Sequence, residues 1–286
     1  MTTLSAALIQ NIVRTALAED VGAGDITTEV SIPADLSGTA SIIAKEPCVV
    51  AGLALVDVVF RELSGHVRPL VSDGDVVEPA QRVCVITGPA RAILTGERTA
   101  LNFLQKLSGI ATLTRQFVEA VAGTKTQILD TRKTTPTFRA LEKYAVAAGG
   151  GTNHRLGLFD AAMFKDNHRV ILARLGPTAL GQAVAAARHR QPNLPVIIEA
   201  DTLADVESAL AAHANHILLD NMSLDELRAV VQWVAGRAKL EASGGVRLAT
   251  VRAIAETGVD YISVGALTHS ARAMDFSLEM QPEDVG

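Results

Sequence analysis

The second half of the sequence repeats a short apolar run that ends near a polar or small residue and is followed by a helical segment. The clearest runs are PVIIE (195–199), HILLD (216–220), LEA (240–242) and YISV (261–264). They end at residues 199, 220, 242 and 264, so successive ends lie 21, 22 and 22 residues apart. This regular period predicts parallel strands that are joined by right-handed helical crossovers.

Two earlier runs, Gln127–Asp130 and Ala161–Lys165, extend the same pattern to six predicted strands. Helical spacing of apolar residues predicts the intervening helices near 137–147, 177–190, 202–211, 223–235 and 247–257. Six strands are too few for the usual closed barrel of eight. We therefore expect an α/β protein whose second domain is an open, six-stranded α/β barrel.

The first part of the chain has a different pattern. Helices are predicted over 4–18, near 53–63 and over 92–121, the last with a possible break at Ser108-Gly109, and residues 20–30 are predicted to form a turn-rich loop. Short β-like runs fill 37–91, and the runs at 73–77 and 83–86 suggest a hairpin of the lipoyl or biotinyl carrier type. A carrier domain needs a lysine at the hairpin tip, but no lysine lies between Lys45 and Lys106. A structural α/β sandwich is therefore favoured.

The overall composition excludes several classes of protein. The chain has 286 residues, 48% of them apolar, and a net charge of −5, which argues against a broad nucleic-acid-binding face. No apolar stretch approaches the ~20 residues of a membrane span, and the N-terminus lacks the pattern of a signal peptide. Cys48 and Cys84 are predicted to be buried thiols. We therefore expect a cytoplasmic protein that binds neither nucleic acid nor membrane.

Each of the six predicted strands is followed by residues suited to a binding site. In chain order these are Thr131-Arg132-Lys133, Lys165, Glu199, Asp220, Ser243-Gly244-Gly245 and Gly265-Ala266. Active sites of α/β barrels lie at the carboxyl ends of the strands. A functional site at this edge is therefore favoured over ordinary polar loops.

Positive charge is concentrated in one segment of this acidic chain. Residues 125–174 hold nine Lys or Arg against four Asp or Glu, which gives 9 − 4 = +5. Arg132, Lys133, His154, Arg155 and Lys165 could converge on carboxylate or phosphate groups. Any one of them alone could equally be a solvated loop charge, but together they indicate a site for a small, multiply charged anion.

Glu199 and Asp220 end neighbouring predicted strands. Such a pair could hold Mg²⁺ through water, bind a sugar diol, or act as acid and base. Helix capping is the alternative role, but Asp201 and Ser223 are better placed for it. The two glycine-bearing turns suit a phosphate group. His216, with His66, His189 and His213, shows no metal-ligand spacing and is expected to be a surface or structural residue.

Taken together, these motifs closely resemble the quinolinate phosphoribosyltransferase family over nearly the whole chain. The most specific elements are DTRKTTP (130–136), HRLGL (154–158) and KDNH (165–168). EDVGAGDITT (19–28), GERTALN (96–102), LSGIAT (107–112), LEKYAV (141–146), LDN (219–221), SGG (243–245) and VGALTH (264–269) complete the resemblance.

The resemblance implies an N-terminal α/β sandwich over 1–112, joined by a C-terminal tail over 272–286, and an open α/β barrel over 113–271. It also implies a homodimer or larger homo-oligomer in which Arg98 reaches the neighbouring subunit's site. The implied reaction joins quinolinate to 5-phosphoribosyl-1-pyrophosphate with Mg²⁺, giving nicotinate mononucleotide, pyrophosphate and CO₂ in NAD biosynthesis.

The resemblance also implies roles for individual residues. Quinolinate would be bound by Arg98, Arg132, Lys133, His154 and Arg155, and Thr131 would also contact a substrate. Lys133 and Lys165 would bind the pyrophosphate, and Glu199 and Asp220 the ribose hydroxyls or Mg²⁺. The 5-phosphate would contact Ser243, Gly244, Gly245, Val264, Gly265 and Ala266. The implied catalytic residues are Lys133, Lys165, Glu199 and Asp220.

Three alternatives stay open at this point. One is a relative of the same fold that is associated with molybdate transport and acts on another substrate. The second is a Schiff-base aldolase that uses Lys165. The third is a non-enzymatic phosphate sensor or scaffold. The full set of Arg-Lys and His-Arg elements favours the quinolinate enzyme over all three.

Overall fold

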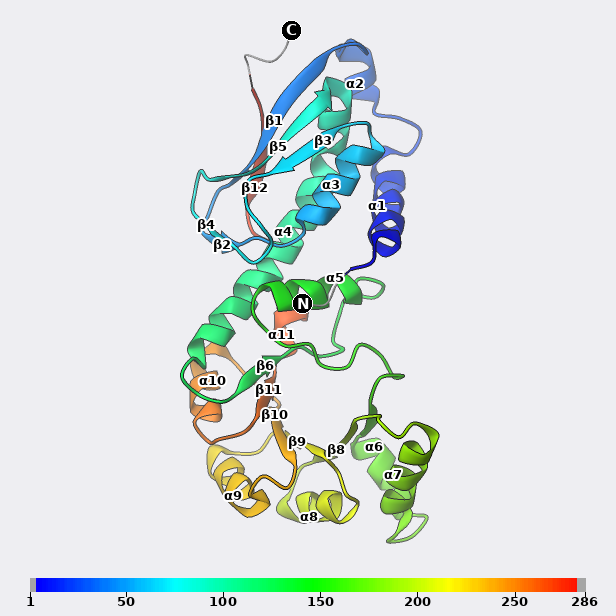
Figure 1. Cartoon of the computed structure of the whole chain (residues 1–286), viewed down its shortest axis with the longest axis vertical. Coiled ribbons are helices and arrows are strands. Elements are labelled where there is room, and N and C mark those ends of the chain that lie inside the picture. Colours follow the sequence, from blue (N-terminus) through cyan, green and yellow to red (C-terminus); the bar gives the residue numbers. More distant parts are fainter. Residues whose placement is uncertain (1–3, 282–286) are drawn as a thin grey trace. The chain divides into compact units, whose positions relative to one another are not determined.

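The computed structural model describes residues 4–281 and divides the chain into two compact units (Figure 1). The first unit comprises Met1–Arg115, Ala140–Gly150 and Ser270–Gly286, and the second comprises Gln116–Arg139 and Gly151–His269. Residues 282–286 of the expected C-terminal tail lie outside the described residues. The first unit therefore takes in a segment, 140–150, that lies in the sequence between two strands of the second.

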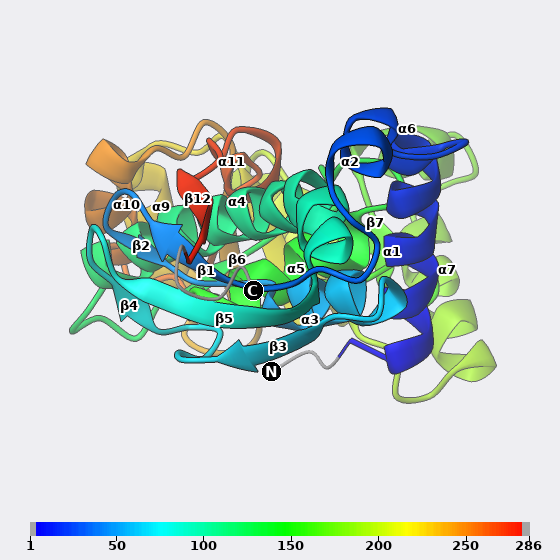
Figure 2. The same ribbon diagram turned by 90° about the horizontal axis from the view of Figure 1, so that it is seen from above.

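The first unit is built on a four-stranded antiparallel sheet in the order β12-β1-β5-β3, seen from above in Figure 2. The four strands of this sheet are β1 (Ser37–Ala44), β3 (His66–Pro69), β5 (Arg82–Pro89) and β12 (Phe276–Met280). A separate pair is formed by the short strands β2 (Cys48–Val49) and β4 (Val76–Val77). The helices of the first unit are α1 (Ala6–Val21), α2 (Ile26–Ser31), α3 (Leu53–Glu62) and most of α4 (Ala90–Ala120) and α5 (Arg139–Ala148). The final strand, β12, pairs with β1, so the end of the chain completes the sheet.

Two local predictions for this unit were wrong. Residues 20–30 are not all loop, because α2 begins within them. The Asp25 side chain caps this helix by accepting a hydrogen bond from Thr28 N at 3.0 Å, and it accepts a second from Thr95 Oγ1 at 3.0 Å. The predicted hairpin also does not form. The short strand β4 pairs with β2, whereas β5 finds longer antiparallel partners in β1 and β3.

Helix α4 runs without a break through Ser108 and Gly109. Both small residues allow other backbone segments to approach the helix. Ser108 Oγ accepts a hydrogen bond from Ala51 N at 3.0 Å. A Cβ atom at position 109 would collide with the carbonyl oxygen of Arg272. The Ser-Gly pair therefore marks close packing rather than a helix end.

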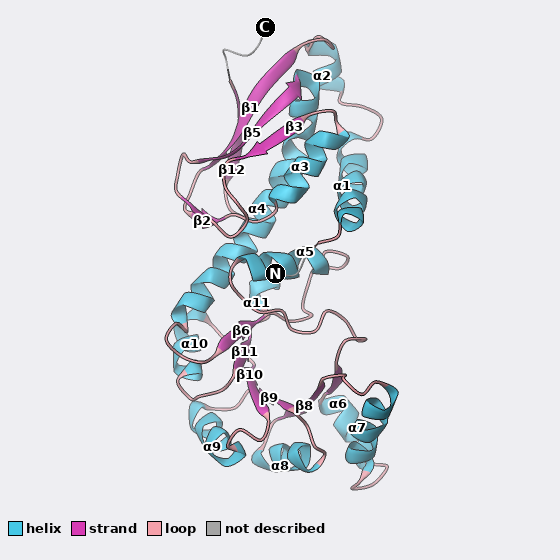
Figure 3. Ribbon diagram, viewed as in Figure 1, coloured by secondary structure: helices cyan, strands magenta, loops and turns pink. Residues whose placement is uncertain are grey.

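The second unit is a six-stranded parallel sheet in the order β6-β11-β10-β9-β8-β7. Its strands are β6 (Gln127–Leu129), β7 (Ala162–Phe164), β8 (Val196–Ala200), β9 (His216–Asp220), β10 (Lys239–Ser243) and β11 (Tyr261–Ser263). Its helices are α6 (Asp166–Ala173), α7 (Ala179–Arg190), α8 (Leu203–Ala211), α9 (Leu224–Val234), α10 (Leu248–Ala255) and α11 (Ala266–His269). The sheet is curved, with α8, α9 and α10 on its outer side (Figure 3).

These features confirm the predicted α/β class and the six parallel strands. Among the described residues, β6 and β7 pair with one neighbour each, so the barrel is open. The sequence did not predict α6. None of its residues is buried, so it carries no apolar stripe of the kind from which helices are recognised. No helix within residues 4–281 is both long and apolar enough to cross a bilayer.

Two glycine-to-alanine substitutions should have opposite effects on stability. Gly109→Ala places a methyl group against the Arg272 carbonyl and should destabilise the protein by ~1–3 kcal/mol or more. Gly181 in α7 has open space around its Cβ position, so Gly181→Ala should stabilise the protein by ~0.5–1 kcal/mol. Urea unfolding of both variants against the parent protein measures this. A Gly109→Ala variant that is as stable as the parent would contradict the packing described for α4.

Candidate active site

A cavity of about 730 Å³ lies at the carboxyl ends of the six parallel strands. Each strand end contributes residues to its wall. Of the site residues expected from the sequence, those lining it are Thr131, Arg132, Lys133, His154, Arg155, Lys165, Glu199, Asp220, Ser243, Gly244, Gly245, Val264, Gly265 and Ala266. Arg98 belongs to the first unit, where it is exposed on α4, and is not among the lining residues.

Four cationic side chains that were expected at the site line this cavity. Among residues 4–281 neither Arg132 nor Arg155 forms an ion pair, although the charge of Asp160 acts on Arg155. Arg155 donates to the Ala161 carbonyl at 3.1 Å and to Met163 Sδ at 3.3 Å, both uncharged acceptors. Burial, followed by the charge of Arg132, lowers the pKa of Arg155. Arg132 Nε is buried and has no hydrogen-bond partner among the described residues. This side of the cavity is therefore suited to an anionic ligand.

The loop that carries Lys133 is held by its backbone. Thr131 Oγ1 accepts a hydrogen bond from Lys133 N at 3.0 Å, and Thr268 Oγ1 donates to the Lys133 carbonyl at 2.7 Å. A Cβ atom at Gly265 would come within 3.0 Å of Lys133 Cδ, so the absence of a side chain leaves room for the lysine. The loop after β6 is thus fastened to the turn after β11.

Lys165 and Glu199 meet at the ends of β7 and β8. Lys165 Nζ lies 3.2 Å from Glu199 Oε2, and the Asp166 backbone N–H donates to Glu199 Oε1 at 3.2 Å. Both carboxylate oxygens of Glu199 therefore have donors. The pair orients the lysine along the cavity wall and offsets the acid's charge.

Asp220 is less well compensated than Glu199. Its carboxylate accepts a hydrogen bond from Asn221 Nδ2 at 2.8 Å. Burial raises its pKa, and the negative charges of Glu199 and Asp201 raise it further. The two acids therefore repel each other, and a cation or a hydroxyl donor bound beside Asp220 would relieve that repulsion.

The turn after β10 requires glycine. Gly244 and Gly245 both have positive φ, +95° and +59°. A Cβ atom at Gly244 would overlap the side chain of Asn221, whose own N–H donates to the Ser243 carbonyl at 2.9 Å. The turn therefore lies directly against the end of β9 and precedes the start of α10. Backbone N–H groups in such a turn suit a phosphate.

Sequence reasoning missed Glu241, which lies within β10, lines the cavity and is fully buried. Its Oε2 atom lies 3.2 Å from His154 Nε2 and 2.8 Å from His216 Nε2. The His216 contact is an ion pair that lacks the angle of a hydrogen bond. An acid in the middle of a buried apolar strand was the available signal, because such a charge requires partners. His216, expected to be a surface or structural residue, is one of those partners.

The protonation state of this cluster follows from its contacts. Burial alone would raise the pKa of Glu241, but the two histidines outweigh burial and hold that pKa at about 2. The Arg155 backbone N–H donates to His154 Nδ1 at 2.7 Å, so Nε2 is the nitrogen that carries the proton toward Glu241. Asp130, buried after β6, accepts a hydrogen bond from His154 N at 2.7 Å. These contacts fix the ring in one orientation at the cavity wall.

Comparison with known proteins matches both parts of the chain to one family. Residues 25–108 match the quinolinate phosphoribosyl transferase N-terminal domain, and residues 110–279 match the C-terminal domain. The chain is 44% identical to a nicotinate-nucleotide pyrophosphorylase [carboxylating] of Mycobacterium leprae over 94% of this chain and 95% of the relative. It is 39% identical to a mitochondrial quinolinate phosphoribosyltransferase [decarboxylating] of Nicotiana tabacum, covering 96% and 83% of the two chains. A solved nicotinate-nucleotide pyrophosphorylase of Francisella tularensis superposes with a TM-score of 0.91 at 39% identity over 98% of each chain.

Replacing the buried acid should change how stability depends on pH. The pKa of Glu241 is lowered from 4.5 to about 2, so its stabilising effect is fully present above pH 4.5 and is lost as the pH falls toward about 2. Glu241→Gln should therefore be less stable than the parent at pH 7, and the difference should shrink in acid. Urea unfolding of both proteins from pH 7 to pH 3 measures the difference. A constant difference across this range would contradict an ionised Glu241.

Proposed function

The chain belongs to the quinolinate phosphoribosyltransferase family, and we propose that it transfers the phosphoribosyl group of 5-phosphoribosyl-1-pyrophosphate to quinolinate. The ring then loses a carboxylate, so the products are nicotinate mononucleotide, pyrophosphate and CO₂, a step of NAD biosynthesis. The observation that carries this proposal is the cavity itself. It combines clustered cations with two carboxylates and two glycine-bearing turns.

The cationic side of the cavity would bind quinolinate, which is a dianion. Arg132 has a buried, unpaired Nε, and Arg155 is held in place by uncharged acceptors. A carboxylate accepts two parallel hydrogen bonds from a guanidinium, so these arginines suit the two carboxylates of the ring. His154 and Lys133 complete this side, with Glu241 holding the His154 ring.

The opposite side would bind the phosphoribosyl donor. Lys165, with Lys133, would contact the pyrophosphate, and Glu199 and Asp220 would bind the ribose hydroxyls. The 5-phosphate would lie against the backbone N–H groups of Ser243-Gly244-Gly245 and Val264-Gly265-Ala266. This arrangement puts the two reactants on facing walls of one cavity.

Mg²⁺ fits the acids of this site. Burial raises the pKa of Asp220, and the negative charges of Glu199 and Asp201 raise it further; a divalent cation bound there would offset those charges. No group of three or more potential ligand side chains occurs among residues 4–281, so Glu199 and Asp220 would share the ion with water and pyrophosphate oxygens. When bound, Mg²⁺ offsets negative charge on the pyrophosphate.

The reaction needs positioning and charge compensation rather than a covalent enzyme intermediate. The bond between the anomeric carbon and pyrophosphate breaks while Lys165 offsets charge on the leaving oxygens. Glu199 and Asp220 stabilise the positive charge that develops on the ribose. The pyridine nitrogen forms the new bond from the opposite face. The carbon–carbon bond to the adjacent carboxylate then breaks, CO₂ departs, and its electron pair stays on the positively charged ring. That ring carbon takes up a proton from solvent, which gives nicotinate mononucleotide.

The structure favours this chemistry over a Schiff-base reaction at Lys165. A Schiff base requires a neutral amine, and a neutral lysine is usually produced by burial or by a neighbouring cation. Lys165 is instead half-exposed and pairs with the Glu199 carboxylate at 3.2 Å, so the burial that produces such an amine is missing.

We further propose that the protein is a homodimer, or a larger homo-oligomer, in which Arg98 enters the partner subunit's cavity. The exposed guanidinium of Arg98 has no hydrogen-bond or ion-pair partner among residues 4–281, so it is available to a ligand outside its own chain. We also propose a cytoplasmic location, which the two free, buried thiols of Cys48 and Cys84 support.

The activity is tested by incubating the protein with quinolinate, 5-phosphoribosyl-1-pyrophosphate and Mg²⁺ and following nicotinate mononucleotide by absorbance. Nicotinate, which lacks the second carboxylate, serves as the matched alternative substrate. Turnover is expected with quinolinate and not with nicotinate, because the guanidinium groups of Arg132 and Arg155 are each expected to bind one carboxylate and nicotinate has only one. Absence of turnover in folded, oligomeric protein would overturn the proposed function.

Arg132→Ala and Lys165→Ala should each lower turnover at least about a hundredfold, because a charge-stabilising contact contributes ~2–4 kcal/mol to the transition state. Steady-state kinetics with quinolinate measures this, and circular dichroism checks the fold. Lys239→Ala is the matched control, because Lys239 lies at the opposite end of β10 and pairs with Asp260 at 3.0 Å. Near-normal activity of either cavity variant would contradict the assigned roles.

The proposed exchange of Arg98 between subunits predicts complementation. Arg98→Ala and Lys165→Ala are each expected to be almost inactive. Mixing the two proteins under conditions of subunit exchange should restore about a quarter of the parent activity, because half of the dimers would then hold one intact site of two. If Arg98 acts within its own subunit, no mixture of the two variants regains activity.

A further inference from the structure

The segment that carries Lys165 is the least buried part of the cavity wall. It consists of β7 and α6, and β7 is an edge strand of three residues that pairs only with β8 among the described strands. None of the residues of α6 is buried, and Val170 and Ile171 are 57% and 61% exposed. Apolar burial therefore contributes little to fixing this segment, so polar contacts must hold it in place.

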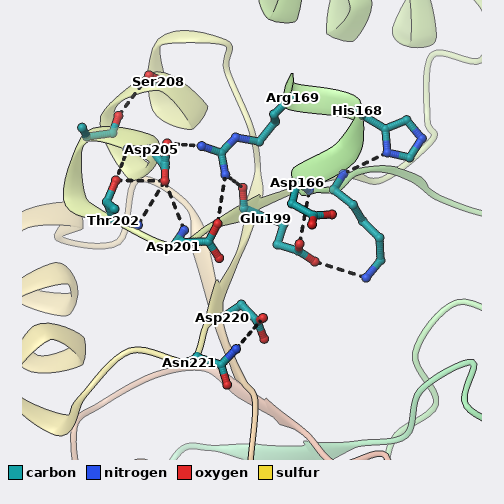
Figure 4. Close-up of polar contacts among 12 residues, drawn as sticks. Asp166, His168, Arg169, Glu199, Asp201, Thr202, Asp205, Ser208, Asp220 and Asn221 are labelled. Carbon is teal, nitrogen blue, oxygen red and sulfur yellow. Dashed lines mark hydrogen bonds and ion pairs between the residues drawn. The ribbon is translucent and has the colours of Figure 1, made fainter. Parts of the chain in front are cut away.

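Besides the pairing of β7 with β8, one side chain supplies several of those polar contacts. Arg169, in the first turn of α6, donates from Nη1 to the Glu199 carbonyl at 2.9 Å. Its Nη2 pairs with the Asp205 carboxylate, and Nη1 lies 3.7 Å from Asp201 Oδ2 (Figure 4). The guanidinium thus joins α6 to the end of β8, to the following turn and to the first turn of α8.

The contacts of Arg169 reach Lys165 through one turn of helix. The Arg169 backbone N–H donates to the Lys165 carbonyl at 3.0 Å. Lys165 then pairs with the side chain of Glu199, the same residue whose carbonyl Arg169 contacts. Arg169 and Lys165 therefore both bind Glu199. Arg169 contacts its backbone carbonyl and Lys165 contacts its carboxylate.

The Asp205 partner is itself fixed. Its Oδ2 accepts a hydrogen bond from Thr202 N at 3.1 Å, and its backbone N–H donates to Thr202 Oγ1 at 3.2 Å; these two bonds form the capping box of α8. Arg169 uses the other oxygen, Oδ1. The guanidinium is thus attached to a rigid helix start rather than to a mobile surface side chain.

We propose that Arg169 is a positioning residue, which fastens the β7–α6 segment to the end of β8 so that Lys165 and Glu199 face the donor side of the cavity. The kinetic effect expected of this residue rests on the proposed function. Its structural role, which is to hold the β7–α6 segment against β8, does not rest on it. The planar guanidinium contacts a carbonyl and two carboxylates at once, which a lysine ammonium could do only in part.

Arg169→Ala tests the proposal by steady-state kinetics. The value of kcat/KM for 5-phosphoribosyl-1-pyrophosphate should fall about tenfold to a hundredfold, since small displacements of reacting groups have effects of this size. Arg169→Lys should recover part of the loss. The Kd of quinolinate, measured by calorimetry, should stay within about threefold of the parent value, because its arginines lie on the other side of the cavity.

Hydrogen exchange gives a readout that does not depend on activity. Backbone amides of residues 166–173 should exchange faster in Arg169→Ala than in the parent, and those of β9 and β10 should not. Arg228→Ala is the matched control, because Arg228 on α9 makes a single exposed pair with Asp225 in its own helix. This control should leave both the kinetics and the exchange unchanged.

The outcomes separate this inference from the proposed function. A kcat/KM within about twofold of the parent value in Arg169→Ala, or unchanged exchange over 166–173, would overturn the positioning role. A loss of quinolinate affinity as large as the loss in kcat/KM for 5-phosphoribosyl-1-pyrophosphate would also overturn it, because it would indicate general unfolding. If the parent protein has no turnover, the proposed function fails, and exchange over 166–173 still decides whether Arg169 holds this segment.

Discussion

All six strands of the second unit run in one direction, and the site depends on this constraint. Parallel strands need a crossover between each pair, and the crossovers place every carboxyl end at the same edge of the sheet. Residues that are up to 138 positions apart in the sequence, namely Thr131 and His269, therefore line one cavity. Because the sheet stays open, the cavity is bounded on one side by an edge strand, β7, which has only one partner.

The charges around this edge are arranged by sign. Within the described part of the chain no carboxylate forms an ion pair with Arg132 or Arg155, and burial, followed by the charge of Arg132, lowers the pKa of Arg155. The pKa of Asp220 is raised, first by burial and then by the negative charges of Glu199 and Asp201. A cavity with uncompensated cations on one side and crowded acids on the other is prepared for a ligand that brings both anionic groups and hydroxyls or a metal ion.

The fold class and most strand ends could be predicted from the sequence, because apolar periodicity is a local property. The runs at 195–199 and 216–220 correspond closely to β8 and β9. Helix α6 was missed because it is not buried, and the expected hairpin was wrong because β5 has better partners elsewhere. The error on the hairpin arises because local patterns report how much of a segment is buried but not which distant segment buries it.

The sequence by itself determined the α/β class, the six parallel strands and the family, because these follow from spacing and from contiguous motifs such as DTRKTTP and KDNH. Only the tertiary structure decided which polar groups meet. Glu241 pairs with His154, 87 residues away, and Arg169 binds the carbonyl of Glu199, 30 residues away. Contacts of this kind depend on strand order and on the orientation of single side chains at the sheet edge. Neither is encoded in a local pattern, since the same residues could have faced solvent without any change in periodicity.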